Sequence, residues 1–133
     1  MQLVRFRVDL GPRCSLGPGK IALLEAIADK GSLTHAAAKL GMSYRYAWLL
    51  LEDLKRSFVE PVTRATVGGR RGGGVELTRF GAEVVRRYNL ATRRIDAVAR
   101  SAFKPLAKAV ASPARSSTAR ARARPIKAAT RKR

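Results

Sequence analysis

SLTHAAAKLGMSYRYAWLLLEDLKRSF, residues 32–58, decides the fold that the sequence predicts. Ser32 and Ser43 favour the N-cap of a helix, and Gly41 suits the end of one. The stretch therefore predicts a short helix before Gly41 and a second from Ser43 to about Phe58. Two helices joined by a short turn with a glycine form a helix-turn-helix. The residues expected to face inward are Ala36, Ala37, Leu40, Met42, Ala47, Leu50, Leu51 and Leu54.

A hairpin is predicted in residues 62–81, VTRATVGGRRGGGVELTRFG, where two short β-branched runs flank a glycine-rich loop. The runs predict strands over residues 62–67 and 75–78, which makes the loop the tip of the hairpin. Thr78 can cap a final helix that continues to about Ala102.

The residues before the helix-turn-helix predict a strand and one more helix. Residues 2–10 alternate between apolar and charged side chains, which indicates a half-buried N-terminal strand. Residues 18–29 carry an apolar stripe at helical spacing. The whole order is strand, helix, helix-turn-helix, hairpin, helix. It predicts a mainly α fold, a winged helix-turn-helix with a β-hairpin wing, over residues 1–103.

The glycine-rich loop has three competing interpretations. A Walker loop needs a Lys followed by Ser or Thr, which is missing here, and a Rossmann loop is followed by a helix rather than a strand. We therefore reject nucleotide binding. A mobile wing fits better, because glycine lets the backbone approach DNA closely. Arg70 and Arg71 can then enter a minor groove, and Arg64 can reach a phosphate. The remaining alternative is a merely flexible hairpin tip.

Charge is the feature of the composition that points to a partner. The net charge of +19 argues for a polyanion, with nucleic acid first and an anionic membrane surface second. No stretch approaches the ~20 apolar residues of a membrane span, and no signal peptide is recognised, so we expect a cytoplasmic protein without a membrane partner. Residues 104–133 hold ten Lys and Arg and no acid. They predict a disordered basic tail that lies along phosphates, the alternative being a solubilising extension.

The start of the second helix of the motif is the predicted contact with base edges. Arg45 can donate two hydrogen bonds to a guanine, or one to a phosphate. Tyr44 and Tyr46 can contact phosphates or thymine methyl groups. Trp48 points either partly toward DNA or against the wing. Two hydroxyl-bearing residues at the start of the first helix are expected to hold a phosphate. These are Ser32 and Thr34.

The final helix, residues 78–102, carries an uncharged stripe spaced by three and four residues. Such a seam predicts a coiled-coil-like contact with a second copy, because a small domain cannot cover a helix of roughly 36 Å. The alternative is that the stripe packs on its own domain, and we favour the dimer contact for its outer half. The stripe includes Val84, Tyr88, Ala91, Ile95 and Val98.

No group of residues predicts catalysis. His35 is the only histidine and Cys14 the only cysteine, so N and S ligands cannot assemble a zinc site. Glu52 and Asp53 are adjacent and therefore diverge on a helix. We expect neither an enzyme nor a metal or cofactor.

Two quoted stretches resemble one known family. Residues 31–48, GSLTHAAAKLGMSYRYAW, and residues 64–88, RATVGGRRGGGVELTRFGAEVVRRY, are similar to the N-terminal DNA-binding domain of ModE, the molybdate-responsive bacterial regulators of transcription. The resemblance covers roughly residues 18–103. It implies a winged helix that dimerises on a palindromic operator. It also implies DNA-facing roles for Ser43, Tyr44, Arg45, Trp48 and the wing from Arg64 to Gly74, which includes Thr66.

The sequence departs from this family after the winged helix. ModE proteins continue into small β-rich domains that bind molybdate, whereas here the basic tail follows. We therefore expect a stand-alone form that does not itself bind molybdate. The prediction is a homodimeric, sequence-specific regulator that binds double-stranded DNA, with a link to molybdate transport or molybdenum metabolism by analogy. The alternatives are a nucleoid-type architectural protein with little specificity and a module whose wing binds protein.

Overall fold

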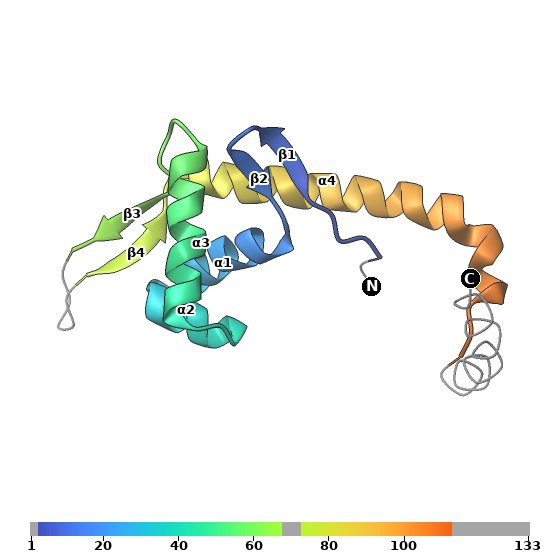
Figure 1. The fold of residues 1–133 in the computed structure, drawn as a ribbon, viewed down its shortest axis with the longest axis horizontal. Coiled ribbons are helices and arrows are strands. Elements are labelled where there is room, and N and C mark those ends of the chain that lie inside the picture. Colours follow the sequence, from blue (N-terminus) through green and yellow to red (C-terminus); the bar gives the residue numbers. More distant parts are fainter. Residues whose placement is uncertain (1–2, 68–72, 113–133) are drawn as a thin grey trace, which may run out of the picture. The chain divides into compact units, whose positions relative to one another are not determined.

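The computed structural model describes residues 3–67 and 73–112, which form four α-helices and two small β-hairpins (Figure 1). In chain order the elements are β1 (Val8–Gly11), β2 (Cys14–Leu16), α1 (Pro18–Lys30), α2 (Leu33–Leu40), α3 (Tyr44–Ser57), β3 (Thr63–Thr66), β4 (Gly74–Leu77), α4 (Arg79–Phe103) and a 3-10 helix (Lys104–Ala109). This order is a winged helix-turn-helix, and it confirms the predicted fold class. Within the part of the chain so described, no helix is both long and apolar enough to span a membrane.

The ends of the helix-turn-helix follow from short-range chemistry. Ser32 Oγ accepts a hydrogen bond from the backbone N–H of His35 at 3.1 Å, and Ser43 Oγ accepts one from Tyr46 at 3.0 Å. Gly41 ends α2 with a φ of 69°, in the left-handed region that glycine adopts without strain. The predicted caps are confirmed, and α2 and α3 begin and end within one residue of the predicted limits.

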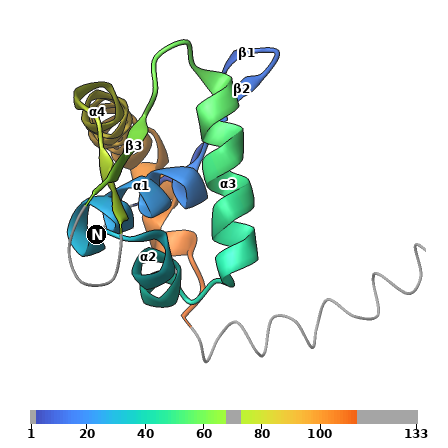
Figure 2. The same cartoon turned by 90° about the vertical axis from the view of Figure 1, so that its left-hand side faces the viewer.

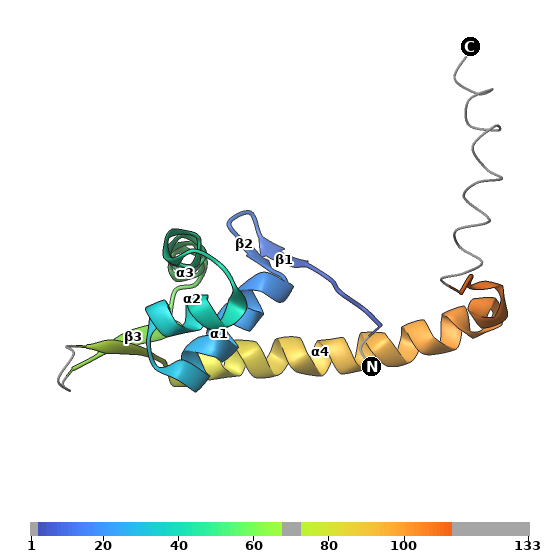
Figure 3. The same cartoon turned by 90° about the horizontal axis from the view of Figure 1, so that it is seen from below.

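Two apolar clusters hold the elements together. One joins β2, α1, the end of α3 and the first half of α4, and the other joins α1, α2 and α3. Ala36, Ala37 and Ala47 are all at most 2% exposed, because small side chains let α2 and α3 approach closely. In Figure 3, α2 and α3 lie on one side of α4, and α1 crosses the beginning of α4. The predicted inward-facing residues are therefore confirmed, with Leu40, Met42 and Leu50 only partly buried.

The N-terminal segment differs from the predicted single strand over residues 2–10. Only Val8–Gly11 is a strand, and it pairs antiparallel with β2, which we had not predicted. The alternation in residues 3–9 is nevertheless real, because every second side chain is half-buried. Ahead of β1, Phe6 is half-buried because it packs on α4 rather than because it pairs in a sheet. The Phe6 ring stacks on Tyr88 with centroids 4.5 Å apart, and the Tyr88 hydroxyl donates to the Phe6 carbonyl at 2.5 Å.

Asp96 of α4 fixes the segment further along the same helix. Its Oδ1 accepts hydrogen bonds from the backbone N–H groups of Leu3 and Val4, at 3.1 and 2.9 Å. The chain ahead of β1 thus satisfies part of its backbone hydrogen-bonding capacity on a helix side chain.

The wing, by which we mean β3, β4 and their connecting loop, is joined directly to the helix-turn-helix. Its strands pair antiparallel from Thr63 opposite Leu77 to Thr66 opposite Gly74. The backbone N–H of Val75 also donates to the Gly31 carbonyl at 3.0 Å, between α1 and α2. The wing therefore has a hydrogen bond to the start of the motif that presents α3.

The chain divides into two compact units, residues 1–98 and 99–133. In the second unit the structure describes residues 99–112, which comprise the last turn of α4 and the 3-10 helix Lys104–Ala109, without a buried residue. The predicted disordered tail starts at residue 104. Its first six residues differ from this prediction, because they form the 3-10 helix. Residues 113–133 of that tail lie outside the described residues.

Candidate nucleic-acid interface

The first two turns of α3 present an unusual set of exposed side chains. Tyr44 and Tyr46 are 54% and 53% exposed, and Trp48 is 41% exposed. Between them Ala47 is fully buried, which anchors the opposite face of the helix in the core. Aromatic rings of this size normally bury most of their surface, so three exposed aromatic side chains on one short stretch are unusual.

Arg45 lies within the same exposed turn. The acidic residues of α3 are engaged elsewhere, since Glu52 pairs with Lys55 at 3.2 Å and Asp53 pairs with Lys20. Tyr44, Arg45 and Trp48 together line a notch on the surface of α3. The structure thus brings together three of the predicted contacts on one face, and Trp48 belongs to this notch.

The start of α2 is a second exposed cluster of polar groups. Ser32 Oγ lies 2.8 Å from His35 Nδ1 and also caps the helix, and Thr34 beside it is exposed. At the end of the helix, a hydrogen bond from Lys39 lowers the pKa of Asp29, which therefore stays ionised well below neutral pH. The sequence analysis considered His35 only as a zinc ligand and missed its contact with the capping hydroxyl, which the spacing of three residues could have indicated.

Two side chains at the base of the wing make contacts within the hairpin that the sequence analysis did not predict. Arg64 stands opposite Glu76 in the strand register, and the two form an ion pair of 2.5 Å on the surface. Thr66 Oγ1 accepts a hydrogen bond from the Gly74 N–H at 2.9 Å, which closes the described part of the hairpin. The predicted contacts Arg70 and Arg71 lie outside the described residues.

In Figure 2, β3 lies on the left and α3 on the right, and α2 lies below them. The exposed start of α3, the start of α2 and the wing belong to this same unit of residues 1–98. The contact from Val75 to Gly31 sets the wing against the helix-turn-helix. This arrangement can present one helix and one hairpin to a partner together.

The stripe on α4 divides into a covered and an uncovered half. Val84 and Tyr88 are 7% and 8% exposed and belong to the core of their own domain, so they offer little surface to a second copy. For the inner half of the stripe, this burial favours the alternative that the stripe packs on its own domain. The outer residues Ile95 and Val98 are 36% and 68% exposed.

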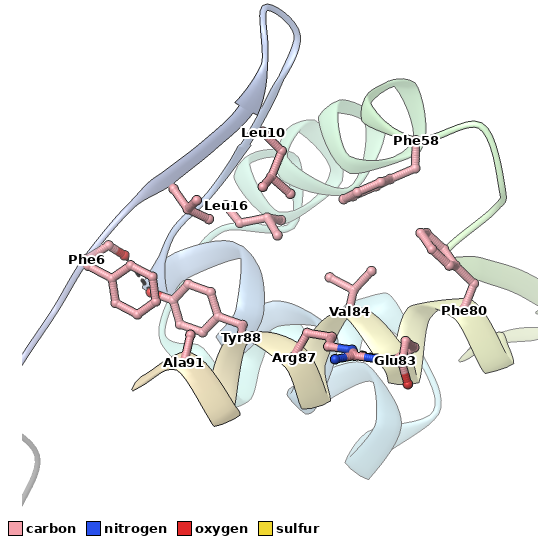
Figure 4. Close-up of a pocket in the computed structure, with 11 residues that line it drawn as sticks. Phe6, Leu10, Leu16, Phe58, Phe80, Glu83, Val84, Arg87, Tyr88 and Ala91 are labelled. Atoms are coloured by element: carbon pink, nitrogen blue, oxygen red, sulfur yellow. Dashed lines mark hydrogen bonds and ion pairs between the residues drawn. The ribbon is translucent and has the colours of Figure 1, made fainter. Parts of the chain in front are cut away.

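An apolar groove of about 330 Å³ adjoins the stripe (Figure 4). The Phe6–Tyr88 stack forms one end of it, and the ion pair between Glu83 and Arg87 lies at its rim. Hydrogen bonds from Arg86 and Arg87 lower the pKa of Glu83, so the carboxylate stays charged. The apolar walls come from three places: the β1–β2 hairpin, the residue that follows α3, and α4 itself. They include Leu10, Leu16, Phe58, Phe80, Val84 and Ala91.

Known proteins resemble the chain in sequence. It is 36% identical over 86 residues to the molybdenum transport protein ModE of Azotobacter vinelandii. The aligned stretch covers 65% of this chain and 32% of that protein. It is 36% identical over 87 residues to the transcriptional regulator ModE of Yersinia pestis, with shares of 65% and 33%. It is 34% identical over 73 residues to the DNA-binding transcriptional dual regulator ModE of Escherichia coli K12, with shares of 55% and 28%.

The chain is a homologue of the ModE proteins. The resemblance expected from the helix-turn-helix and wing motifs is thereby confirmed. The chain spans about a third of the length of the ModE relatives that it matches. No protein-family model matches it. Among solved structures, the CbnR DNA-binding domain in its complex with DNA aligns with a TM-score of 0.47 and 22% identity, over 69% of this chain and 97% of that one.

Proposed function

We propose that this protein is a transcriptional regulator that binds operator DNA as a homodimer. The observation that carries the proposal is the exposed start of α3, where Tyr44, Arg45 and Trp48 form a notch on the second helix of a helix-turn-helix. The net charge of +19 supports a polyanionic partner. The ModE homologues include proteins named as transcriptional regulators.

In the proposed complex, α3 enters the major groove and the wing approaches the adjacent minor groove. Arg45 reads a base edge, and the hydroxyl groups of Ser32, Thr34 and Ser43 contact phosphates. Arg64 exchanges Glu76 for a phosphate, because its ion pair lies on the surface, where such pairs contribute little.

The proposed dimer uses the uncovered half of α4. Ile95 and Val98 expose apolar surface on the line along which Val84, Tyr88 and Ala91 face the groove. A second copy that covers these residues would remove them from water, which favours association. Two copies of α3 would then enter successive major grooves about 34 Å apart.

We further propose that residues 1–103 form the DNA-binding part and that residues 104–133 add sequence-independent affinity. The second stretch holds ten Lys and Arg without an acid, so each phosphate contact would release a counterion. We propose genes of molybdate transport or molybdenum metabolism as targets, on the names of the homologues. Molybdate binding by this chain is not part of the proposal.

Binding by fluorescence anisotropy tests the proposal across a salt series. The full chain and residues 1–103 are titrated with the DNA upstream of the protein's own gene and with a scrambled duplex. A preference of at least about a hundredfold that survives removal of the tail would support a sequence-specific regulator. The tail should account for several units of the salt slope. Equal binding to both duplexes, lost with the tail, would instead establish an architectural DNA-binding protein.

A further inference from the structure

We propose that the notch between Tyr44 and Trp48 receives the 5-methyl group of a thymine in the major groove, beside a guanine that Arg45 contacts. The inference rests on the proposed DNA-binding function and specifies which base edges this surface recognises. It concerns the described start of α3 alone, and needs neither the tail nor the wing.

The notch is built by a single helix. Its volume is about 250 Å³, and its lining consists of Tyr44, Arg45 and Trp48. Tyr44 and Trp48 are four residues apart, so their side chains lie on the same face one turn apart. The backbone beneath them is held by the Ser43 cap and by the buried Ala47. The backbone that carries the two walls is therefore fixed before the helix meets DNA.

The chemistry of the walls selects one base. The faces of the two aromatic rings offer apolar surface, and a polar group held against a ring face would lose its water without gaining a hydrogen bond there. The base edges in the major groove are distinguished by hydrogen-bond donors and acceptors and by the methyl group of thymine. The methyl group is the apolar one of these features. A methyl group between the rings is therefore the complementary occupant.

Arg45 adds the polar half of the recognition. Its guanidinium carries a fork of donors that matches the O6 and N7 acceptors of guanine. Because Glu52 and Asp53 are already paired with lysines, the acidic groups of α3 do not compete for it. The surface thus predicts a thymine and a guanine at neighbouring positions of each half-site.

The experiment begins with selection of a binding sequence from a randomised duplex library by the full-length protein. Each thymine of the selected duplex is then replaced, one at a time, by deoxyuridine, which removes the methyl group and keeps the base pair. At one position in each half-site we expect a loss of affinity of about fourfold, the factor for burying one CH₂ group. Replacement of other thymines should change affinity by less than twofold.

Variants assign the effect to the notch. Trp48→Ala and Tyr44→Ala should each bind the thymine and uracil duplexes equally. Leu49→Ala is the matched control, because Leu49 is an exposed apolar residue of the same helix that does not line the notch, and it should keep the fourfold difference. Trp48 is the only tryptophan, so its fluorescence in the wild-type protein supplies a second readout that needs no variant. The thymine duplex should change this fluorescence more than the uracil duplex does.

The outcomes separate the two proposals. If selection yields no sequence, the proposed function fails. If a sequence emerges but no deoxyuridine position matters and the Trp48 fluorescence does not distinguish the duplexes, the methyl inference fails and the regulator survives. A uracil effect that persists in both notch variants would also overturn the inference, because the methyl group would then be recognised elsewhere.

Discussion

Gly81→Ala tests the contact that attaches α4 to the rest of the domain. Gly81 lies in the first turn of α4, and its N–H donates to Thr78 Oγ1 at 3.0 Å. A Cβ atom at this position would lie 2.0 Å from the carbonyl oxygen of Val62, whereas real Cβ atoms essentially never approach within 3.0 Å. The helix and Val62 would have to separate by about 1 Å. That movement also stretches the hydrogen bond from Thr78 N to the same carbonyl, now 3.0 Å.

The cost follows from three contributions. Overpacking costs about 1–3 kcal/mol, and a weakened hydrogen bond costs about 1 kcal/mol. The better helix propensity of alanine returns up to about 1 kcal/mol. The net destabilisation is therefore about 2 kcal/mol, which lowers the Tm of a domain of this size by roughly 8–16 °C.

Thermal unfolding followed by circular dichroism measures this change. Gly19→Ala is the control, because the same substitution in α1 meets no atom within 4 Å and should leave Tm unchanged or raise it by a few degrees. If Gly81→Ala unfolds at or above the wild-type temperature, the packing of α4 against Val62 is not as close as described.

Three further predictions concern binding. Arg45→Ala should cost about 1–3 kcal/mol of binding free energy on the selected sequence and relax the preference at one base pair. If anisotropy shows equal losses of affinity on selected and random DNA, Arg45 is a phosphate contact instead. The double variant of Ile95→Asp and Val98→Asp should sediment as a monomer and keep its far-UV spectrum, and an unchanged dimer would place the interface elsewhere. Gly74→Ala would bring a Cβ to 2.3 Å from the Gly31 carbonyl oxygen. The wing would then be displaced, and we expect operator binding to weaken severalfold. An unaltered affinity would show that the position of the wing does not affect DNA binding.

The helices of this protein were predictable because their signals are local. Ser32, Ser43 and Gly41 act on groups within a few residues, and the structure confirms each as a cap. The exposed aromatic turn of α3 was predictable for the same reason, since a buried Ala47 orients its neighbours. The joint notch of Tyr44, Arg45 and Trp48 was not, because its shape depends on side-chain directions that spacing alone leaves open.

The sequence by itself determined the helix-turn-helix, the two strands of the wing and the basic character of the chain. Only the tertiary structure decided how the stripe on α4 is used and what holds the wing. Tyr88 is buried because Phe6, 82 residues away, lies against it, and Val84 is buried in the core cluster that joins α4 to β2, α1 and α3. The wing is held because the backbone N–H of Val75 donates to the carbonyl of Gly31, which lies 44 residues earlier in the chain. Contacts of such separation arise from the packing of whole elements, so a pattern within one element does not reveal them.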